Sequence, residues 1–498
     1  MNTDEQRFGM SVKKEENFPE WYQQVVIKAE LVDYYDIKGC YIMRPNGYYI
    51  WKVIKEFFTK EIDARGVEEC YFPMLVTKSS IEKEKKHIEN FAPELAWITK
   101  CGDEDIAEPV AIRPTSETIM YPSYSKWLKS HRDLPLRLNQ WCNVLRWEVK
   151  NTLPFIRGRE FLWQEGHSAF LTKEEAVEEV FDILNLYKKI YEEWLAVPVI
   201  PGIKSENEKF GGAEFTTTIE AFIPQSGRGV QAATSHFLGQ NFSKMFDIKV
   251  NDQNTDEYVF QNSWGITTRT IGVMVMVHGD DKGMVMPPRV SQIQVVIVPC
   301  GIKNNEEANK KLFEYIDGIE QELKKNNIRV YFDSKLNVQP GYKFNHWEIR
   351  GVPIRLEIGP KDLKNGNVML YTRFNQNKRS EKRENIGELL SKELDIIHQS
   401  MFEIAKKERD SKIVRTNSWE EFMTAIEDKK MLLVPWCQDP DCDDDIRKSS
   451  TIHDENGEVV SMGAKSLCIP LENKKYSGEK CIKCDKEAKS DGLFGRSY

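Results

Sequence analysis

Two pairs of charged residues near the middle of the chain could bind phosphate. Arg146 and Glu148 are two residues apart, and Arg157 and Arg159 follow on a stretch interrupted by proline and glycine. Alternate residues of a strand face one side, so the first pair should point the same way from a strand over 141–149. Arginine binds phosphate and carboxylate oxygens bidentately and stays charged. We therefore expect two strands joined by a basic loop that binds a polyanion; the alternative is a solvated hairpin.

A second set of reactive residues lies near the end of the chain. Cys437 and Cys442 form one short-spaced pair, and Cys481 and Cys484 form another. Two such pairs are typical of a four-thiolate zinc site, whereas four free thiols are the alternative. Cys468 falls between the pairs and is expected to take no part.

Length, composition and charge limit the classes of protein that fit. The chain has 498 residues, which allows two to four domains, and its net charge of −8 means that any RNA contact must come from a local patch. It contains no apolar run of membrane-spanning length, and its first residues are too polar for a secretory signal. We expect a cytoplasmic protein without a membrane partner.

The elements that must position these residues can be predicted in the first 286 residues. An amphipathic helix over 47–64 precedes a strand over 69–76, which a proline interrupts. A turn at 113–116 leads into a helix, and a capping box opens a longer helix over 172–195. On the strand over 231–238, Thr234 and His236 share a face, whereas Gln231 has the opposite parity and needs a bulge to join them. Arg269 begins an apolar helix against its dipole, and such inconsistencies concentrate at functional sites.

A different architecture is predicted after the two prolines at 287 and 288. Strands over 292–298, 328–332 and 354–358 alternate with helices over 305–325 and from 341, which indicates a small α/β domain. Residues 341–390 contain ten Lys or Arg against six Asp or Glu. This local excess suits RNA, although a solvated face would explain it equally well.

Four strings in order carry a family resemblance. R-x-E, then a basic loop and R-E-F over 146–161, resembles motif 2 of the class II aminoacyl-tRNA synthetases. RPTSE at 113–117, FLWQEGH at 161–167 and GITTR at 265–269 resemble the prolyl-tRNA synthetases in particular. The cysteine-bearing last segment, which ends in Tyr498, resembles the zinc-bearing extension of their eukaryotic and archaeal branch. The helix, strand and proline over 47–76 resemble motif 1, which implies a homodimer, although sequence physics supports an ordinary edge strand equally.

The resemblance implies an α+β fold and an activity. A class II catalytic domain over 1–286, an antiparallel sheet flanked by helices, would be followed by an α/β anticodon-binding domain over 287–405 and a small zinc-binding domain over 406–498. The protein would activate L-proline with ATP to prolyl-adenylate and transfer the prolyl group to the 3′ end of tRNA(Pro). ATP as substrate, Mg²⁺ on its phosphates and structural Zn²⁺ are implied with it.

The resemblance also assigns residues to roles. The residues expected to bind proline are Thr115, Glu117, Arg146, Trp163, Glu165, His167 and His236. Those expected to bind ATP are Arg146, Glu148, Arg157, Phe161, Gln231, Thr234, Thr267 and Arg269. Arg146 and Arg269 are the expected catalytic residues, because both would stabilise charge at the reacting phosphates.

Two other classes of function are weighed against this one. A catalytically inactive synthetase-like protein that binds tRNA or regulates would keep the fold and lose the arginines, all of which are present. The second is a synthetase of the same subclass for another small amino acid, such as threonine or serine. A threonine enzyme would need zinc ligands in the pocket, and no cysteine lies near the proline-type strings to supply them. Fewer than a hundred residues separate motifs 2 and 3, so no inserted editing domain is expected there.

Overall fold

The computed structural model describes residues 9–85, 94–252, 255–302, 306–335, 337–472 and 478–498. Its largest element is a sheet of eleven strands in the order β20-β21-β25-β24-β9-β10-β11-β14-β8-β7-β3. The strands that belong to the first 286 residues are β3 (Glu68–Glu69), β7 (Leu136–Leu145), β8 (Glu160–Phe170), β9 (Ile200–Ile203), β10 (Phe215–Ile223), β11 (Arg228–Gly239) and β14 (Phe260–Thr267). From β9 to β7 the neighbours are antiparallel, as expected for a class II catalytic sheet.

Helices cover one face of this sheet and form the main hydrophobic core. They are α2 (Phe18–Lys28), α3 (Pro45–Asp63), α6 (Lys173–Lys189) and α8 (Arg269–His278). Ile50, Ile54 and Phe58 on α3 are fully buried, so the apolar stripe predicted for this helix faces the core. Thr172 caps α6 by accepting from the backbone of Glu175, as its capping box predicted, and a π-helical turn over Ile190–Trp194 completes the helix.

The strand predicted over 69–76 is divided into two. β3 ends at Glu69 and pairs with β7, whereas β4 (Leu75–Thr77) pairs with β6 (Glu104–Ile112) in a small sheet with β5 (Trp97–Cys101). Pro73 lies in the gap, and proline cannot donate a ladder hydrogen bond. The helix α4 (Lys78–Lys85) follows β4, and α5 (Glu117–Trp127) begins at Glu117 as predicted.

The strand predicted over 141–149 ends early. β7 stops at Leu145, so Arg146 and Glu148 lie in the turn that follows and do not share a strand face. The backbone N–H of Arg146 donates to the carbonyl of Arg159 at 2.7 Å, which closes the mouth of the loop. Arg146 is therefore placed by the loop and not by strand parity.

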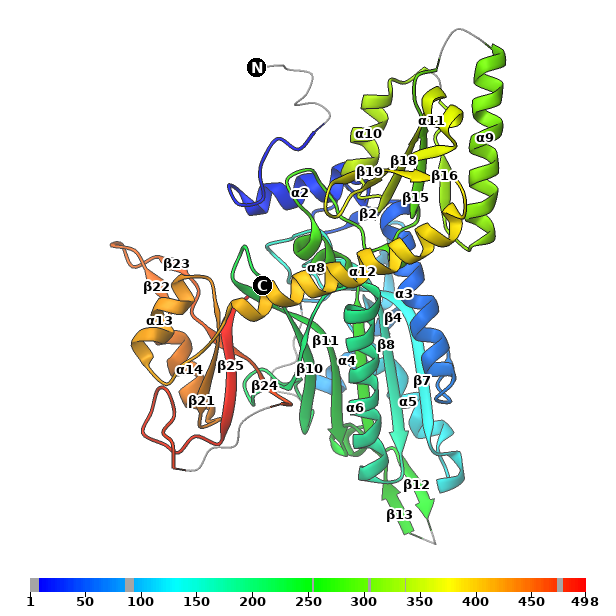
Figure 1. The fold of residues 1–498 in the computed structure, drawn as a ribbon. Helices are drawn as coiled ribbons and strands as arrows, with labels where there is room; N and C mark the ends of the chain where they lie inside the picture. Colours follow the sequence, from blue (N-terminus) through cyan, green and yellow to red (C-terminus); the bar gives the residue numbers. More distant parts are fainter. Residues whose placement is uncertain (1–8, 86–93, 253–254, 303–305, 336, 473–477) are drawn as a thin grey trace.

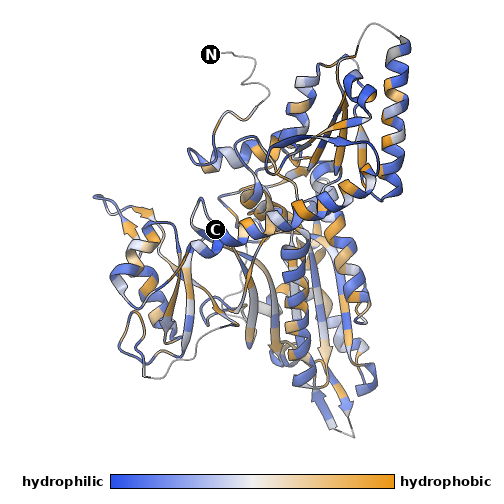
Figure 2. Ribbon diagram, in the orientation of Figure 1, coloured by the Kyte–Doolittle hydropathy of each residue, from blue (hydrophilic) through white to orange (hydrophobic). Residues whose placement is uncertain are grey.

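A second sheet follows in the order β16-β15-β17-β18-β19. Its strands are β15 (Val295–Pro299), β16 (Val330–Phe332), β17 (Ile354–Ile358), β18 (Asn367–Thr372) and β19 (Asn377–Lys382). Its helices are α9 (Glu306–Lys325), α10 (Pro340–Ile349), α11 (Pro360–Asn365) and α12 (Ile386–Ser411). β16, β15 and β17 are parallel, which confirms the α/β prediction. Figure 2 shows strands of this sheet as hydrophobic and α9 as mixed, because one stripe of α9 packs inward.

The last segment extends the first sheet. It contains β20 (Ile413–Arg415), α13 (Trp419–Glu427), β21 (Met431–Trp436), α14 (Pro440–Ser449), β22 (Ile452–His453), β23 (Val459–Ser461), β24 (Lys465–Pro470) and β25 (Ser490–Ser497). β24 pairs with β9, and β25 pairs with β21 and β24 and in parallel with the start of β11. In Figure 1, α12 runs from the second sheet to this segment and spans the boundary expected after residue 405.

A few short elements complete the described chain. They are β1 (Val32–Tyr34), β2 (Tyr41–Met43), α7 (Asn241–Met245), β12 (Lys249–Asp252), β13 (Thr255–Tyr258) and the 3-10 turns at His131–Asp133 and Pro288–Val290. Over the residues the structure describes, no helix combines the length and the apolar character that crossing a membrane requires.

Candidate functional site

A cavity of about 830 Å³ opens at the polar face of the central sheet. Strands β8, β11 and β14 supply its floor, and the loop between β7 and β8 closes over it. Every residue assigned above to proline or ATP lines this cavity: Thr115, Glu117, Arg146, Glu148, Arg157, Phe161, Trp163, Glu165, His167, Gln231, Thr234, His236, Thr267 and Arg269. Residues from Thr115 to Arg269, on separate elements, thus converge on one space.

The deepest part of the floor is a buried polar network on β8. One oxygen of Glu165 accepts from Gln140 Nε2 at 2.7 Å and from Ser116, and the other lies 3.0 Å from His167 Nε2. The second ring nitrogen of His167 lies 3.0 Å from the hydroxyl of Tyr121.

The electrostatics of this network favour an ion pair. Burial opposes ionisation of Glu165, yet the hydrogen bond and charge of His167 lower the pKa of the Glu165 carboxyl below its usual value. Burial likewise opposes protonation of His167, yet the hydrogen bond to Glu165 and the nearby charge of Glu117 raise the pKa of the imidazole. A buried carboxylate and imidazolium therefore support the pocket from below.

The wall beside this floor combines acidic and aromatic side chains. Glu117 lies in the first turn of α5 and accepts from the hydroxyl of Thr115. The guanidinium of Arg146 donates to the carbonyl of Pro114 at 3.2 Å and lies 5.3 Å from the ring of Phe161 and 5.6 Å from that of Trp163. One cation and one carboxylate therefore face the same small space, which suits a zwitterionic amino acid.

The two basic residues of the loop point to different places. Arg157 is exposed and lines the cavity. Arg159 does not line it; its guanidinium stacks on Trp147 at 4.4 Å and donates to the carbonyl of Val149. Both arginines were expected to lie over a bound polyanion, but only Arg157 lies where it could contact a ligand in the cavity.

Arg269 and Glu148 also line the cavity. Arg269, the first residue of α8, donates to the carbonyls of Ile156 and Gln231 at 3.1 and 3.0 Å. The buried Oε2 of Glu148 is one of several buried polar atoms without a hydrogen-bond partner among the described residues. A carboxylate oxygen of this kind is costly to leave unpaired, so it is suited to accept from a bound donor.

The predicted bulge on β11 is present. Ile219 pairs with Ala233 and Glu220 pairs with Gln231, which leaves Ala232 unopposed. This extra residue reverses the parity of the strand and lets Gln231 and Thr234 line the same cavity. The prediction from strand parity is confirmed.

His236 contacts the predicted Thr234 and two residues that the sequence did not single out, Thr216 and Phe210. Its two ring nitrogens lie 2.9 Å from the hydroxyl of Thr216 and 3.1 Å from that of Thr234, and the ring of Phe210 is 4.7 Å away. Burial, with the charge of His167, lowers the pKa of His236 to about 3, so the imidazole is neutral. Thr216 could have been found only from its register opposite His236, which the sequence does not give.

Other unpredicted residues reach the cavity from far along the chain. Arg228 and Tyr498 both line it, with the guanidinium 5.5 Å from the tyrosine ring. Tyr498 is held there because its backbone N–H donates to the carbonyl of Gly229 at 3.1 Å. The last segment of the chain therefore contributes directly to this space.

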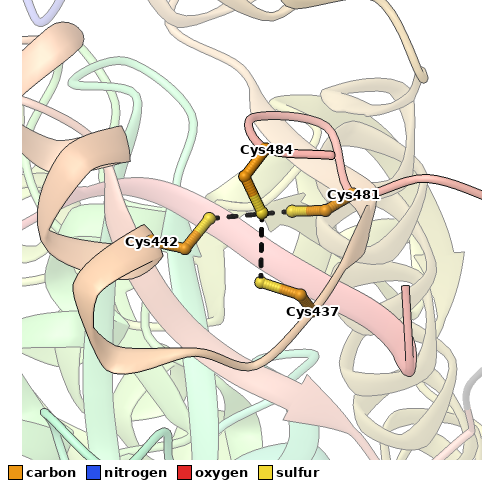
Figure 3. A group of neighbouring side chains, drawn as sticks. All are labelled: Cys437, Cys442, Cys481 and Cys484. Carbon is orange, nitrogen blue, oxygen red and sulfur yellow. Dashed lines mark hydrogen bonds between the residues drawn. The ribbon is translucent and has the colours of Figure 1, made fainter. Parts of the chain in front are cut away.

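The four short-spaced cysteines form a separate cluster. Figure 3 shows Cys437, Cys442, Cys481 and Cys484 pointing toward one another, and their sulfurs all lie within 4.8 Å of one another. The Cys442–Cys481 and Cys437–Cys484 sulfur distances are both 3.7 Å. Zinc–sulfur bonds of about 2.3 Å in a tetrahedron place sulfurs roughly 3.8 Å apart, so this donor set fits Zn²⁺. Cys468 is buried elsewhere, against Gly202.

Family models match three parts of the chain. Residues 99–278 match the tRNA synthetase class II core domain (G, H, P, S and T), and residues 294–393 match the anticodon binding domain. Residues 419–498 match the model described as prolyl-tRNA synthetase, C-terminal.

Whole-chain relatives agree with these matches. The proline–tRNA ligase of Encephalitozoon cuniculi is 57% identical over 99% of this chain and 100% of its own length. The cytoplasmic proline–tRNA ligase of Arabidopsis thaliana is 50% identical over 98% of this chain and 91% of its own. A crystal structure of prolyl-tRNA synthetase from Cryptosporidium parvum, complexed with halofuginone and AMPPNP, superposes with a TM-score of 0.93 at 45% identity, covering 100% of this chain and 99% of that one.

Proposed function

The chain belongs to the prolyl-tRNA synthetases, and from that premise we propose how its cavity residues divide the reaction. The protein is a proline–tRNA ligase: it activates L-proline with ATP to prolyl-adenylate and transfers the prolyl group to tRNA(Pro). The observation that carries the assignment of residues is their convergence on one cavity from separate elements.

We place proline over the buried polar network of β8. Glu117 would accept from the secondary ammonium of proline, and Thr115 would add a hydroxyl contact. Arg146 would bind the carboxylate, while Trp163 and the neutral ring of His236 would enclose the pyrrolidine. Glu165 and His167 would line the floor as the buried ion pair described above. The chemistry of each group matches the part of the amino acid that it would meet.

We place ATP beside Glu148 and Arg269. Glu148 would accept from the adenine amino group, a role that its unpaired buried oxygen supports. Phe161 and Arg269 would stack on the two faces of the adenine, and Arg157 would bind the terminal phosphates. Gln231, Thr234 and Thr267 would line the rest of the nucleotide. The AMPPNP of the Cryptosporidium parvum structure is an ATP analogue, which agrees with a nucleotide in this fold.

The reaction then needs positioning and charge neutralisation and no protein nucleophile. The proline carboxylate attacks the α-phosphorus, and pyrophosphate leaves. Arg146, within reach of both the carboxylate and the α-phosphate, would stabilise the charge that develops between them, and Arg269 would act from the nucleotide side. We therefore propose these two arginines as the catalytic residues.

Mg²⁺ is proposed as a cofactor of the nucleotide. The triphosphate carries more negative charge than the arginines facing it neutralise, and Mg²⁺ is bound chiefly by phosphate oxygens and water. The amide and hydroxyl oxygens of Gln231 and Thr234 at the cavity are ligands of the type that Mg²⁺ accepts. When bound, the ion would supply neutralisation of the phosphates.

Zn²⁺ is proposed as a structural ion held by Cys437, Cys442, Cys481 and Cys484. The four sulfurs leave no open position for a substrate, which is typical of a structural site. They come from the end of β21, from α14 and from the loop before β25, so one ion would tie three parts of the segment together.

We propose a homodimer through the motif 1 region. Tyr71 and Met74, between β3 and β4, and Leu75, the first residue of β4, are 73%, 40% and 44% exposed. Large apolar side chains gathered in this way mark interaction surfaces. A second copy of the chain would cover them.

The remaining proposals concern partners, place and domain limits. We propose that tRNA(Pro) binds largely through the α/β domain, whose match to an anticodon-binding model supports this. We propose a cytoplasmic location, as in the name of the Arabidopsis thaliana relative. Residues 1–286, 287–405 and 406–498 are the proposed domains, although β24 and β25 join the third to the sheet of the first.

Charging of tRNA(Pro) with labelled proline tests this function. We expect ATP-dependent formation of prolyl-tRNA by the purified protein. The rival reading, an inactive protein that only binds tRNA, predicts tRNA binding without charging. The complete set of arginines at the cavity and the ligase names of the whole-chain relatives do not favour that reading.

Discrimination against alanine should rest on the pocket alone. Between motifs 2 and 3, the described strands belong to the central sheet or to the β12–β13 hairpin, so these residues form no separate editing domain. Each missing methylene lowers binding by only about 1–3 kcal/mol. We expect the isolated chain to hydrolyse alanyl-tRNA(Pro) no faster than buffer does; clear enzymatic deacylation would show a hydrolytic site that this account omits.

A further inference from the structure

A loop between β9 and β10 forms part of the cavity wall. Glu208 and Phe210 on this loop line the cavity, and the Phe210 ring lies against His236 at 4.7 Å. The loop has a local turn, because the backbone N–H groups of Glu208 and Lys209 both donate to the carbonyl of Ser205. These bonds fix the shape of the turn, but they do not fix its position over the cavity.

The backbone N–H of Phe210 donates to the hydroxyl of Thr216 within the catalytic sheet at 3.0 Å, but residues 205, 207 and 208 of the loop are anchored to the last segment of the chain. The hydroxyl of Ser205 donates to Asp443 Oδ2 at 3.0 Å, and both residues are buried. The side-chain amide of Asn207 donates to the carbonyl of Pro440 at 2.9 Å, and Lys465 forms a 2.6 Å ion pair with Glu208. Successive anchors of the loop thus end on α14 or β24.

The base of the loop is joined to the same segment. Lys204 is buried, with its ammonium 2.7 Å from Glu220 Oε1 and donating to the carbonyl of Leu467 at 2.8 Å. At Gly202 a Cβ atom would stand 2.5 Å from the sulfur of Cys468, so only glycine allows β24 to approach β9 this closely. Because β24 packs this closely against β9, a shift of β24 would also shift the base of the loop.

We propose that Asp443 and Lys465 are positioning residues of the amino-acid pocket. They hold residues 205–210 in place, and through them they hold Phe210 against His236 and Glu208 at the cavity wall. The C-terminal segment would then determine the fit of proline as well as its own stability. This inference rests on the proposed placement of proline beside His236.

The test uses loop-anchor variants of the full chain in proline-dependent ATP–pyrophosphate exchange. Ser205→Ala removes the donor to Asp443 without touching the residues beside the cysteines, and Lys465→Met removes the ion pair. For the double variant we expect the KM for proline to rise about tenfold, because small misplacements of a pocket wall are costly, while the KM for ATP stays within about twofold. Lys465→Arg keeps a positive charge opposite Glu208, so its KM for proline should equal that of the wild type.

Lys429→Met is the matched control. Lys429 also joins the last segment to the catalytic sheet, donating to the carbonyl of Gln225 at 3.2 Å, but it does not touch the loop. Its KM for proline should equal that of the wild type. Zinc content and thermal unfolding, measured on each variant, separate loss of the metal or of the fold from misplacement of the loop.

The outcomes are distinct. A double variant with lowered thermal stability and an unchanged KM for proline would overturn the positioning role and leave the proline site intact. An equal rise in the KM for proline for Lys429→Met would also overturn it. Any weakened contact between the last segment and the catalytic sheet would then raise this KM, and not the loop anchors in particular. Wild-type protein without proline-dependent exchange would overturn the proposed function and this inference together.

Discussion

Arg146→Ala and Arg269→Ala are each expected to lower proline-dependent ATP–pyrophosphate exchange by at least a factor of about 100. Each change removes a positive charge directed at the reacting phosphates, and loss of one such group costs on the order of 3 kcal/mol in the transition state. Arg146 lies between the aromatic rings of Phe161 and Trp163, and Arg269 begins α8.

Binding of tRNA should survive both changes. Most of the tRNA contacts are expected on the α/β domain, where backbone phosphates make binding sensitive to salt. Folding should also survive, since alanine is a good helix former and Arg269 opposes the dipole of α8. Arg132→Ala is a suitable control because Arg132 is exposed and outside the cavity. Variants that keep full exchange would contradict the assignment of these arginines, though not the activity itself.

Loss of the thiolate cluster should have the largest effect on stability. We expect metal analysis to find about one zinc per chain, and Cys481→Ser to lose it. Structural zinc contributes roughly 10–16 kcal/mol of binding free energy in small zinc domains. Losing even a small part of this free energy should unfold the segment that carries β21, α14 and the 481–484 loop. Thermal unfolding and zinc content measured together would show this.

Cys101→Ser provides the matched control, because Cys101 is exposed and lies far from the cluster in sequence and fold. It should keep both zinc and stability. Purified wild-type protein that contains no zinc, with all four clustered thiols reactive in a titration, would contradict the site.

The elements with strong local signals could be predicted from the sequence. The apolar stripe of α3, the capping box of α6 and the turn into α5 were each predicted close to their observed bounds. The bulge in β11 was predicted because Gln231 and Thr234 have opposite parity. The four cysteines were predicted from spacing alone, and they do gather. In each case the residues that decide the structure are near one another in the chain.

Features that depend on distant pairing could not be predicted. β7 ends at Leu145, so the strand predicted over 141–149 was wrong beyond that residue, although Arg146 and Glu148 both line the cavity. The pairing of β24 with β9 joins residues more than 250 apart, and no local pattern marks it. Tyr498 reaches the cavity through the pairing of β25 with the start of β11, and Thr216 reaches it through its register opposite His236. The sequence therefore predicted the residues that line the cavity better than it predicted the strand pairings and loop contacts that position them.

The most direct test of this account is ATP–pyrophosphate exchange measured with each of the twenty amino acids in turn. We expect strong exchange with proline and, at equal concentration, weak exchange with alanine and none with threonine or serine. Exchange with a different amino acid alone would contradict the assignment of Glu117, Trp163 and His236 to a proline pocket. A protein that binds tRNA(Pro) and supports exchange with no amino acid would contradict the account as a whole.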